Sequence, residues 1–431
     1  MEITIRSERI LQRIDALAQI GKISETGVCR LALSPEDREA VLVVEGWMKE
    51  AGLTTRIDAF GNLIGRLEGS DPLAPAVMLG SHIDTQPYAG RFDGIIGVIG
   101  AIETVQRFRE TGFVPAVPVE VVSFCDEEGC RFNKGLFGVR GMLGRLEEGE
   151  LERTDRNGVT RREALLAFGG SPDAFAESEY KPGAVGAYLE LHIEQGPVLE
   201  AMDRPVGIVT GISGPIWWTV TMSGFAGHAG SVPMSMRCDA LVGAARVITG
   251  LKELASREEG APTVGTVGSL QVFPDSRNII PEWVQFTVDL RDIDKERRDR
   301  LEAELRALIA EAAEENGLTY EIREDTVSDP RYCAERIMNV ISEAADGIGL
   351  KDTPKLMSGP FHDAMEMSRY CDYGMIFVRS KDGISHNPAE YSSPGDIAAG
   401  TELLYRTALV LCGRAASQHP GMEAHSSLKE A

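Results

Sequence analysis

Along the first 200 positions, the pattern of apolar and polar residues predicts helices that alternate with strands. A helix is predicted at 35–52. Ser34 is its cap, a proline and two acidic residues form its first turn, and apolar residues follow at helical spacing. Residues 54–59 and 63–67 predict a hairpin around Gly61-Asn62. Further strands are predicted at 76–79 and 117–124, and a further helix at 95–109. This alternation is typical of α/β folds, which place functional groups at the carboxyl ends of strands.

The pattern changes near Gly211 and changes back after Asp329-Pro330. Between these points the sequence predicts, in order, a strand at 217–223, a helix at 239–258, strands at 264–273 and 283–291, a helix at 295–316 and a strand at 318–324. This β-α-β-β-α-β order is that of a ferredoxin-like α+β domain. We therefore expect an α/β catalytic domain formed by 1–212 and 329–414, with the domain at 213–328 inserted into it. Residues 415–431 are polar and are predicted to be disordered.

Composition narrows the class of protein. A chain of 431 residues is too long for one compact core, and its net charge of −22 argues against nucleic acid or an anionic membrane as a partner. The N-terminal segment has a charged amphipathic pattern rather than that of a signal peptide, and no run approaches the roughly 18–20 apolar residues of a membrane span. Seven cysteines without a CxxC pair predict reduced thiols and a cytoplasmic location.

Two short segments carry the chemistry, GSHIDTQPYAGRFDGIIG at 80–97 and DEEG at 126–129. Imidazole and carboxylate are ligands that divalent cations take, and two cations about 3.5–4 Å apart need one shared carboxylate. Asp93 is the natural bridging ligand, while Asp84 is placed to hold the second ring nitrogen of His82. Of the two adjacent glutamates, Glu128 would ligate a metal and Glu127 would remain as the base.

Two more histidines, His192 in HIEQGP and His386 in GISHNP, would complete the two metal shells. Any one of these residues alone could be explained as a polar side chain at a strand end whose hydrogen bonds are satisfied within the protein. Their occurrence together favours a two-metal hydrolase.

These motifs resemble the family of N-carbamoyl-L-amino-acid hydrolases, β-ureidopropionases and allantoate amidohydrolases, within the di-metal aminoacylase and carboxypeptidase superfamily. The matching segments run in family order from about residue 10 to 412: GSHIDTQP, GRFDG, DEEGCRF, ELHIEQGPVLE, GHAG, NIIP at 278–281 with DLR at 289–291, HDA at 362–364, and MIFVRSKDGISHNPAEYS. HIEQGP together with GISHNP is typical of the carbamoyl-hydrolase branch. The resemblance implies a di-metal exopeptidase-like catalytic domain with an inserted lid and dimerisation domain.

The resemblance also implies a ligand set for two divalent ions, which could be zinc, manganese, cobalt or nickel. One ion takes His82, Asp93 and His192, and the other takes Asp93, Glu128 and His386. Glu127 is implied as the acid and base of the reaction.

The substrate implied by the resemblance is a small molecule with a carboxylate beside a ureido or amide carbon. Arg291 matches the residue that grips this carboxylate, and closure of the inserted domain would bring Arg291 and Asn278 onto the substrate. Gln195 matches a second hydrogen-bonding residue. His228 matches a histidine that polarises the scissile carbonyl from the partner subunit of a homodimer.

Other positions are open to more than one interpretation. His362 either supports the site or contacts the substrate, and just before it this chain has Pro360-Phe361 where the family has small residues. That departure affects the shape of the substrate pocket. Trp217 and Trp218 are interpreted as packing residues, and the run KERRDR at 295–300 as a solvated helix face.

The function that these residues predict is a metal-dependent amidohydrolase that converts N-carbamoyl-L-amino acids into the amino acid, ammonia and carbon dioxide. β-Ureidopropionase and allantoate amidohydrolase are the alternatives within the family. A non-catalytic ligand-binding relative is the alternative from another class, and it would be expected to have lost a ligand or the base.

Overall fold

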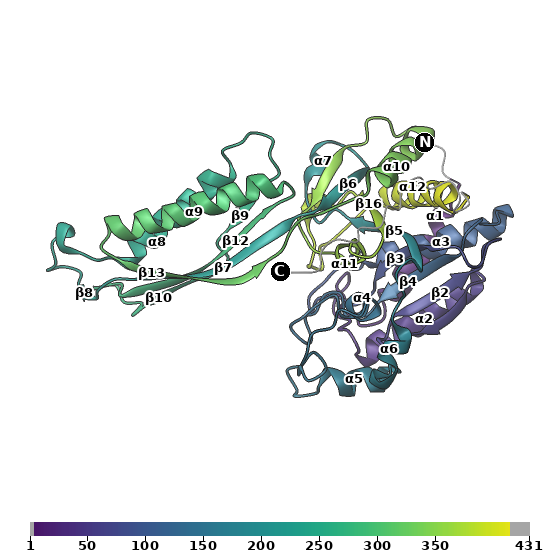
Figure 1. The fold of residues 1–431 in the computed structure, drawn as a ribbon, viewed down its shortest axis with the longest axis horizontal. Coiled ribbons are helices and arrows are strands. Elements are labelled where there is room, and N and C mark those ends of the chain that lie inside the picture. The colour runs from purple at the N-terminus through teal and green to yellow at the C-terminus, as the bar shows by residue number, and fades with distance from the viewer. Residues whose placement is uncertain (1–3, 414–431) are drawn as a thin grey trace. The chain divides into compact units, whose positions relative to one another are not determined.

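The structure is a computed structural model that describes residues 4–413, so the tail expected at 415–431 lies outside the described residues. The chain divides into two compact units (Figure 1). The first unit contains the residues up to Thr210, Cys333–Leu356 and the residues from His362 onward, and the second contains Gly211–Tyr332 and Met357–Phe361. Within residues 4–413 there is no helix of the length and apolar character needed to cross a membrane.

The first unit is built on a mixed β-sheet whose central strands are parallel. The strands lie in the order β1 (Thr54–Ile57), β2 (Leu63–Leu67), β4 (Val119–Phe124), β3 (Ala76–His82), β5 (Val185–Ile193), β16 (Asp372–Val378) and β6 (Val206–Ile212), and β15 (Lys355–Ser358) pairs with β6. Parallel pairing places His82 beside Phe124 and Phe377 beside His192. The segments that follow β3, β4 and β5 therefore leave the sheet at the same edge.

Helices cover this sheet and complete the core of the first unit. They are α1 (Ser7–Leu17), α2 (Pro35–Glu50), α3 (Ile95–Thr111), α4 (Phe137–Met142), α5 (Arg161–Phe168), α6 (Phe175–Ser178), α7 (Val198–Ala201), α10 (Glu335–Gly347), α11 (Asp363–Met367) and α12 (Pro394–Gly413). Helices α3 and α12 pack against each other and against the parallel strands. Helix α2 starts as its sequence predicts, because the Ser34 hydroxyl accepts a hydrogen bond of 3.1 Å from the amide of Asp37.

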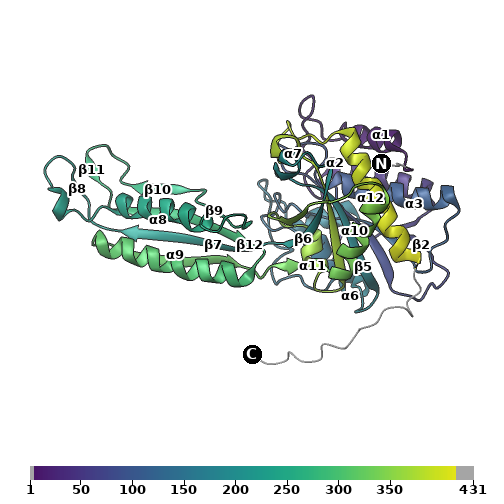
Figure 2. The ribbon, with the colours of Figure 1, turned by 90° about the horizontal axis from the view of Figure 1, so that it is seen from above.

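The second unit has a five-stranded antiparallel sheet with two helices, α8 (Ala240–Ala255) and α9 (Lys295–Glu315), along it (Figure 2). The strand order is β10 (Leu270–Phe273), β12 (Trp283–Asp292), β7 (Gly214–Ser223) and β13 (Thr319–Val327), and β9 (Val264–Thr266) also pairs with β12. Two further short strands of this unit, β8 (Gly227–His228) and β11 (Ile279–Ile280), pair with each other. A third, β14 (Arg331–Tyr332), pairs with the end of β6. The core of this unit is formed where alternate residues of β7 and β12 face the two helices.

The predicted elements differ from the observed ones in detail. Strand β3 continues through Gly80 to His82, and the strand predicted at 264–273 is two strands, β9 and β10. The interpretation of KERRDR as a solvated face is wrong for Arg298, which is buried and donates to the carbonyls of Gly214 and Ser328. A long side chain on a helix can reach carbonyls at strand ends, and a charge pattern along the chain does not reveal this.

Candidate metal centre

Five potential ligands reach the same edge of the first unit from separate segments. His82 is the last residue of β3, and His192 lies in β5 one residue before its end. Asp93 precedes helix α3, and Glu128 follows β4 after a turn in which Asp126 has φ of 56°. His386 lies in the loop before α12 and has φ of 52°. The parallel order of β4, β3 and β5 is therefore what brings distant segments together.

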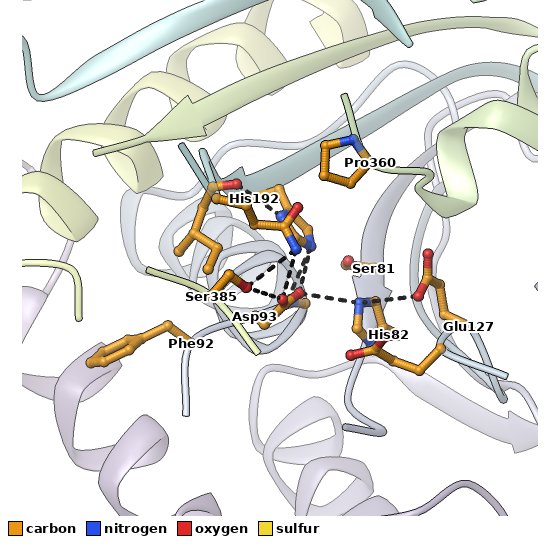
Figure 3. A network of polar contacts seen from close by, with 12 residues as sticks. Ser81, His82, Phe92, Asp93, Glu127, His192, Pro360 and Ser385 are labelled. Atoms are coloured by element: carbon orange, nitrogen blue, oxygen red, sulfur yellow. Dashed lines mark hydrogen bonds and ion pairs between the residues drawn. The ribbon is translucent and has the colours of Figure 1, made fainter. Parts of the chain in front are cut away.

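Asp93 lies at the centre of this group (Figure 3). Its Oδ1 atom is 3.1 Å from Nε2 of His192 and 3.7 Å from Nε2 of His82. Its Oδ2 atom is 3.3 Å from Nε2 of His386, whose ring is also 3.6 Å from Oε1 of Glu128. Each oxygen of one carboxylate thus faces a different set of ligands, which is the arrangement that a bridging ligand requires.

The donor atoms form two groups with the dimensions of metal sites. The ligand atoms of His82, Asp93 and His192 lie within 4.8 Å of one another, and so do those of Asp93, Glu128 and His386. Within residues 4–413, Oε1 of Glu128 is buried without a hydrogen-bond partner. A buried carboxylate oxygen without a donor is the feature that a cation would satisfy.

The ring orientation of His82 provides a second test of the fit. Its Nδ1 atom is 3.0 Å from the backbone carbonyl of Asp84, and a carbonyl can only accept, so Nδ1 carries the hydrogen. Burial lowers the pKa of His82 to about 4, which keeps the ring neutral near pH 7. The lone pair on Nε2 then faces oxygens of Asp93 and Glu127 at 3.7 and 3.8 Å. Two acidic side chains and a lone pair that face one another form a favourable place for a cation.

Electrostatics in the group are dominated by crowded carboxylates. Although burial acts against ionisation of Asp93, the neighbouring His192 and His386 hold the pKa of this carboxyl well below its usual range. Hydrogen bonding to Asp93 raises the pKa of His386 to about 9. Burial opposes the charge on His192, but Asp93 outweighs it and raises the pKa of His192 to about 9. In the absence of a metal, protons would provide the positive charge between these groups.

Glu127 and Glu128 differ in their surroundings. Burial first, then Asp93, raises the pKa of Glu128 to about 8. Burial first, then the charges of Asp363 and Glu128, raises the pKa of Glu127 well above its usual range. Glu127 faces the His82 ring at 3.8 Å and belongs to neither ligand group (Figure 3). A carboxylate with a raised pKa beside the ligands has the properties of a general base.

The role of Asp84 differs from the predicted one. Its carboxylate is 3.8 Å from Nδ1 of His82, so the ring is held by the Asp84 backbone carbonyl at 3.0 Å instead. The two carboxylate oxygens accept hydrogen bonds from the amides of Glu127 and Glu128, both at 3.2 Å. Asp84 therefore fixes the backbone that carries the base and a ligand.

Gln195 is in contact with Asp93 in this structure. Its Nε2 donates to Oδ2 of Asp93 at 2.8 Å, and Ser385 donates to the same oxygen at 2.8 Å. Among residues 4–413, the Gln195 Oε1 atom has no hydrogen-bond partner, which leaves it available to a donor on a substrate. Glu390 accepts from the amides of Phe92 and Asp93 at 2.9 and 3.1 Å and thereby supports the same loop.

His362 is packed against a ligand histidine. Its ring lies edge-on to that of His192, with the centroids 4.4 Å apart at 66°. Burial lowers the pKa of His362 well below its usual range, so the ring is neutral. These contacts favour the supporting role for His362.

Glu190 and Asp363, for which no role was predicted although Asp363 belongs to the HDA motif, are fully buried close to the ligands. Glu190 accepts hydrogen bonds from Ser81 at 2.7 Å and from the amide of Ala364 at 3.1 Å, and it forms a third group of possible ligands with His192 and His362. Burial, together with Glu190, raises the pKa of Asp363 well above its usual range. The signal for Glu190 was an acidic residue inside an otherwise apolar strand, two positions before His192.

The remaining predicted residues belong to the second unit and lie at two separate places within it. His228 forms β8, and the amide of the next residue donates to the carbonyl of Asn278 at 2.9 Å, so these two residues are neighbours. Arg291 lies opposite Pro215, at the start of β7. His228 belongs to β8, which follows the other end of β7. The prediction that Asn278 and Arg291 act together on one substrate therefore does not agree with their positions in a single copy.

Comparison with known proteins connects this geometry to a family. The model of the peptidase family M20/M25/M40 matches residues 78–410. The chain belongs to this family. An N-carbamoyl-L-amino-acid amidohydrolase of Pseudomonas sp. (strain NS671) is 48% identical over 407 residues, which cover 94% of this chain and 98% of that protein. A probable allantoate deiminase of Oryza sativa subsp. japonica is 37% identical over 93% of this chain and 87% of that protein.

A solved structure agrees in fold. The amidase of the hydantoinase/carbamoylase family from Burkholderia multivorans matches with a TM-score of 0.89 and 35% identity, over 96% of this chain and 99% of that one. The family resemblance inferred from the motifs is thus confirmed, and so is the mixed α/β class of this M20 family member.

Proposed function

We propose that this M20 family member is a metal-dependent amidohydrolase that cleaves the carbamoyl group of N-carbamoyl-L-amino acids. The observation that carries the proposal is the Asp93 carboxylate, which faces His82 and His192 through one oxygen and His386 through the other. The 48% identity to a relative named as an N-carbamoyl-L-amino-acid amidohydrolase supports the choice of substrate.

Two divalent ions would be held by the two groups of ligands around Asp93. His82, Asp93 and His192 would hold one, and Asp93, Glu128 and His386 the other. When bound, the ions would supply activation of a water molecule and polarisation of the scissile carbonyl. Zinc, manganese, cobalt and nickel all suit a set of imidazoles and carboxylates.

Glu127 is proposed as the residue that moves the proton. Its carboxylate lies beside the ligands and belongs to neither group, so it is placed to take a proton from the attacking water and to return that proton to the departing nitrogen. Asp84 holds the Glu127 amide and so fixes where the carboxylate can point. Gln195 would accept a hydrogen bond from the ureido group through its Oε1, which has no partner in the described part of the chain.

Arg291, His228 and Asn278 are proposed to bind the substrate from the second unit. Arg291 would bind the carboxylate, because a guanidinium offers parallel donors to two oxygens. His228 would stabilise the oxyanion, and Asn278 lies beside it. Arg291 and His228 lie at opposite ends of the ten-residue strand β7. A strand of that length spans roughly 30 Å, which is much longer than the substrate.

It follows that one copy cannot place both Arg291 and His228 on the same small substrate while its sheet stays intact. We therefore propose a homodimer in which His228 and Asn278 come from the partner, with the unit at 213–328 as both the lid and the dimerisation domain. His228→Ala and Arg291→Ala proteins, each inactive alone, should regain part of the activity when mixed. Mixtures that stay inactive, although the dimers exchange subunits, would rule out this arrangement.

The function is tested by ammonia release from metal-stripped protein supplied with Mn²⁺ or Zn²⁺. The substrates are N-carbamoyl-L-methionine, N-carbamoyl-β-alanine and allantoate, with Glu127→Gln as the control. We expect fast turnover of N-carbamoyl-L-methionine, and a loss of roughly a thousandfold or more in kcat for the variant with its metal retained. If all three substrates are inert although metal binds, the substrate proposal is wrong and the metal proposal stands.

An allantoate amidohydrolase is the second candidate, and the 37% identity to an allantoate deiminase supports it. β-Ureidopropionase remains a third possibility from the motifs. The same three substrates separate these functions, because each candidate predicts a different one as the fastest.

A further inference from the structure

The guanidinium of Arg291 is packed against two aromatic rings of the second unit. Its central carbon lies 5.5 Å from the centre of the Trp217 ring and 5.7 Å from that of Phe361. The two rings are themselves 5.9 Å apart at an angle of 47°. A cation over aromatic faces is attracted to them, and the rings also limit how the guanidinium can turn. Trp217 therefore does more than fill the core.

Hydrogen bonds fix the same guanidinium in its plane. Nε and Nη2 donate to the two oxygens of Asp289 at 2.9 and 2.8 Å, and Nη1 donates to the carbonyl of Gly359 at 2.7 Å. An arginine side chain has five N–H groups, so these contacts within the described residues leave two of them. The Arg291 side chain is 19% exposed, which is enough for those two donors to meet a ligand.

We propose that Asp289, Trp217 and Phe361 are positioning residues that hold Arg291 with two donors ready for the substrate carboxylate. This inference rests on the proposed function, in which Arg291 binds that carboxylate. Asp289 offsets much of the positive charge of Arg291, so attraction by net charge alone is weak. Recognition then depends on the direction of the two remaining N–H groups, and a planar carboxylate matches them better than a neutral amide.

The proposal also gives a role to Phe361, at a position where the resemblance of the motifs implies a small residue. Its ring and that of Trp217 cover part of the guanidinium and limit its contact with water. Hydrogen bonds from a partly dehydrated guanidinium to a carboxylate are stronger than those from a fully hydrated one. Phe361 thus acts on the group that binds the carboxylate.

The experiment compares Asp289→Asn with the wild type on N-carbamoyl-L-methionine and on its amide, N-carbamoyl-L-methioninamide. An asparagine retains one acceptor and turns an NH₂ group toward the guanidinium, which frees Arg291 to rotate. We expect KM for the acid to rise roughly tenfold with kcat changed less than about threefold, and the preference for acid over amide to fall by the same factor. If the amide is not hydrolysed, its inhibition constant replaces KM.

The matched control is Asp325→Asn. Asp325 pairs with Arg323 at 2.8 Å on β13, with the same two-residue spacing in the same sheet, and should leave the preference unchanged. A second variant, Phe361→Leu, is compared with Phe273→Leu, which removes a ring stacked 5.4 Å from Trp283 in the same unit. Only Phe361→Leu should raise KM for the acid, by a few-fold.

The outcomes separate this inference from the proposed function. If Asp289→Asn and Phe361→Leu alter acid and amide equally, or alter neither, the positioning role is wrong and the proposed function stands. If the wild type hydrolyses no N-carbamoyl acid, the proposed function is wrong and this inference fails with it.

Discussion

Asp84 is the residue whose role can be tested most directly. Its carboxylate accepts hydrogen bonds from the backbone amides of Glu127 and Glu128. Asp84 therefore fixes the position of both the proposed base and a proposed metal ligand. We expect Asp84→Asn to weaken metal binding by roughly 10- to 100-fold and to lower kcat as well, because supporting contacts of this kind tune metal sites. Metal content after dialysis and steady-state kinetics measure the two effects.

Asp155→Asn is the control for this change, since Oδ1 of Asp155 also accepts two backbone amides, of Asn157 and Val159, at 2.8 and 3.0 Å. Equal metal affinity in the Asp84 and Asp155 variants would show that the Asp84 contact has no bearing on the metal centre.

Single residues also show how far the sequence could predict the site. The proposed ligands His82, Asp93 and His192 could be identified because each lies in a short motif of recognisable chemistry, near the end of a predicted strand or beside a glycine. The contacts of Asp84, Glu190 and Glu390 could not be predicted, because they depend on which backbone amides end up beside a carboxylate. That information depends on the registers of strands far apart in the chain.

At the scale of elements, helix α5 supports the turn that carries the base. Arg161, fully buried on α5, donates to Asp126 and Glu150 at 3.0 Å each, and its guanidinium lies 4.6 Å from the centre of the Phe137 ring. Arg161→Met would leave two buried carboxylates without this partner, so we expect a loss of about 3–5 kcal/mol in the free energy of unfolding. Urea unfolding of the metal-free protein measures it.

Arg162→Met is the neighbouring control, because Arg162 pairs with Glu152 at 3.2 Å on the surface, where the side chains are 46% and 63% exposed. Its removal should cost less than about 1 kcal/mol. Similar losses in both variants would mean that the buried network contributes little to the support of the turn.

The start of helix α3 gives a prediction for the metal centre itself. A Cβ added at Gly94, where φ is 68°, would lie 2.5 Å from Nε2 of His82. At Gly112, which ends the same helix with φ of 72°, no heavy atom of the described chain comes within 4 Å of an added Cβ. Gly94→Ala should therefore abolish metal binding, while Gly112→Ala should only lower stability, by about 1–3 kcal/mol.

Both positions have a positive φ, but ψ is −41° at Gly94 and 18° at Gly112, so an alanine at Gly94 meets greater backbone strain as well as the His82 ring. Unfolding measurements on both variants show whether metal binding by Gly94→Ala is lost in a protein that is still folded. Isothermal titration with Zn²⁺ distinguishes the two variants. Unimpaired metal binding by Gly94→Ala would show that His82 is not a ligand.

The elements themselves were predictable where local signals agree. The hairpin of β1 and β2 has Gly61-Asn62 in its loop, and Ser34 marks the start of α2. The division of 264–273 into β9 and β10 could not be predicted, since both segments pair with β12 and only that pairing shows where they separate. Strand limits of this kind depend on partners rather than on propensity.

At the scale of the whole molecule, the two units differ in whether a single chain brings the residues of each proposed site together. The proposed metal centre lies entirely within the first unit, so the folding of one chain can assemble it. Arg291 and His228 lie at opposite ends of β7 in the second unit. The substrate site that we propose would thus require a second copy, and no motif in the sequence gives the distance between these two residues.

The stability of the whole protein should depend on metal and pH together. His192 and His386 have pKa values raised to about 9 in the metal-free fold, above the value near 6.5 of an unfolded histidine. Such groups stabilise the metal-free protein fully below about pH 6.5, and that contribution is lost as the pH rises through about 9. Burial raises the pKa of Glu128 to about 8, so its contribution to the stability of the metal-free protein also falls as the pH rises.

A bound metal replaces these protons, so metal and protons compete for the same atoms. Between about pH 6.5 and 9, the apparent metal affinity should rise by roughly tenfold per pH unit for each proton displaced. The difference in Tm between metal-loaded and EDTA-treated protein should therefore widen steadily over this range, because ligand binding stabilises the fold by mass action. Calorimetry at pH 6.5, 7.5 and 8.5 measures the trend. A difference that stayed constant would mean that the metal displaces no proton, and that His192 and His386 are not among its ligands.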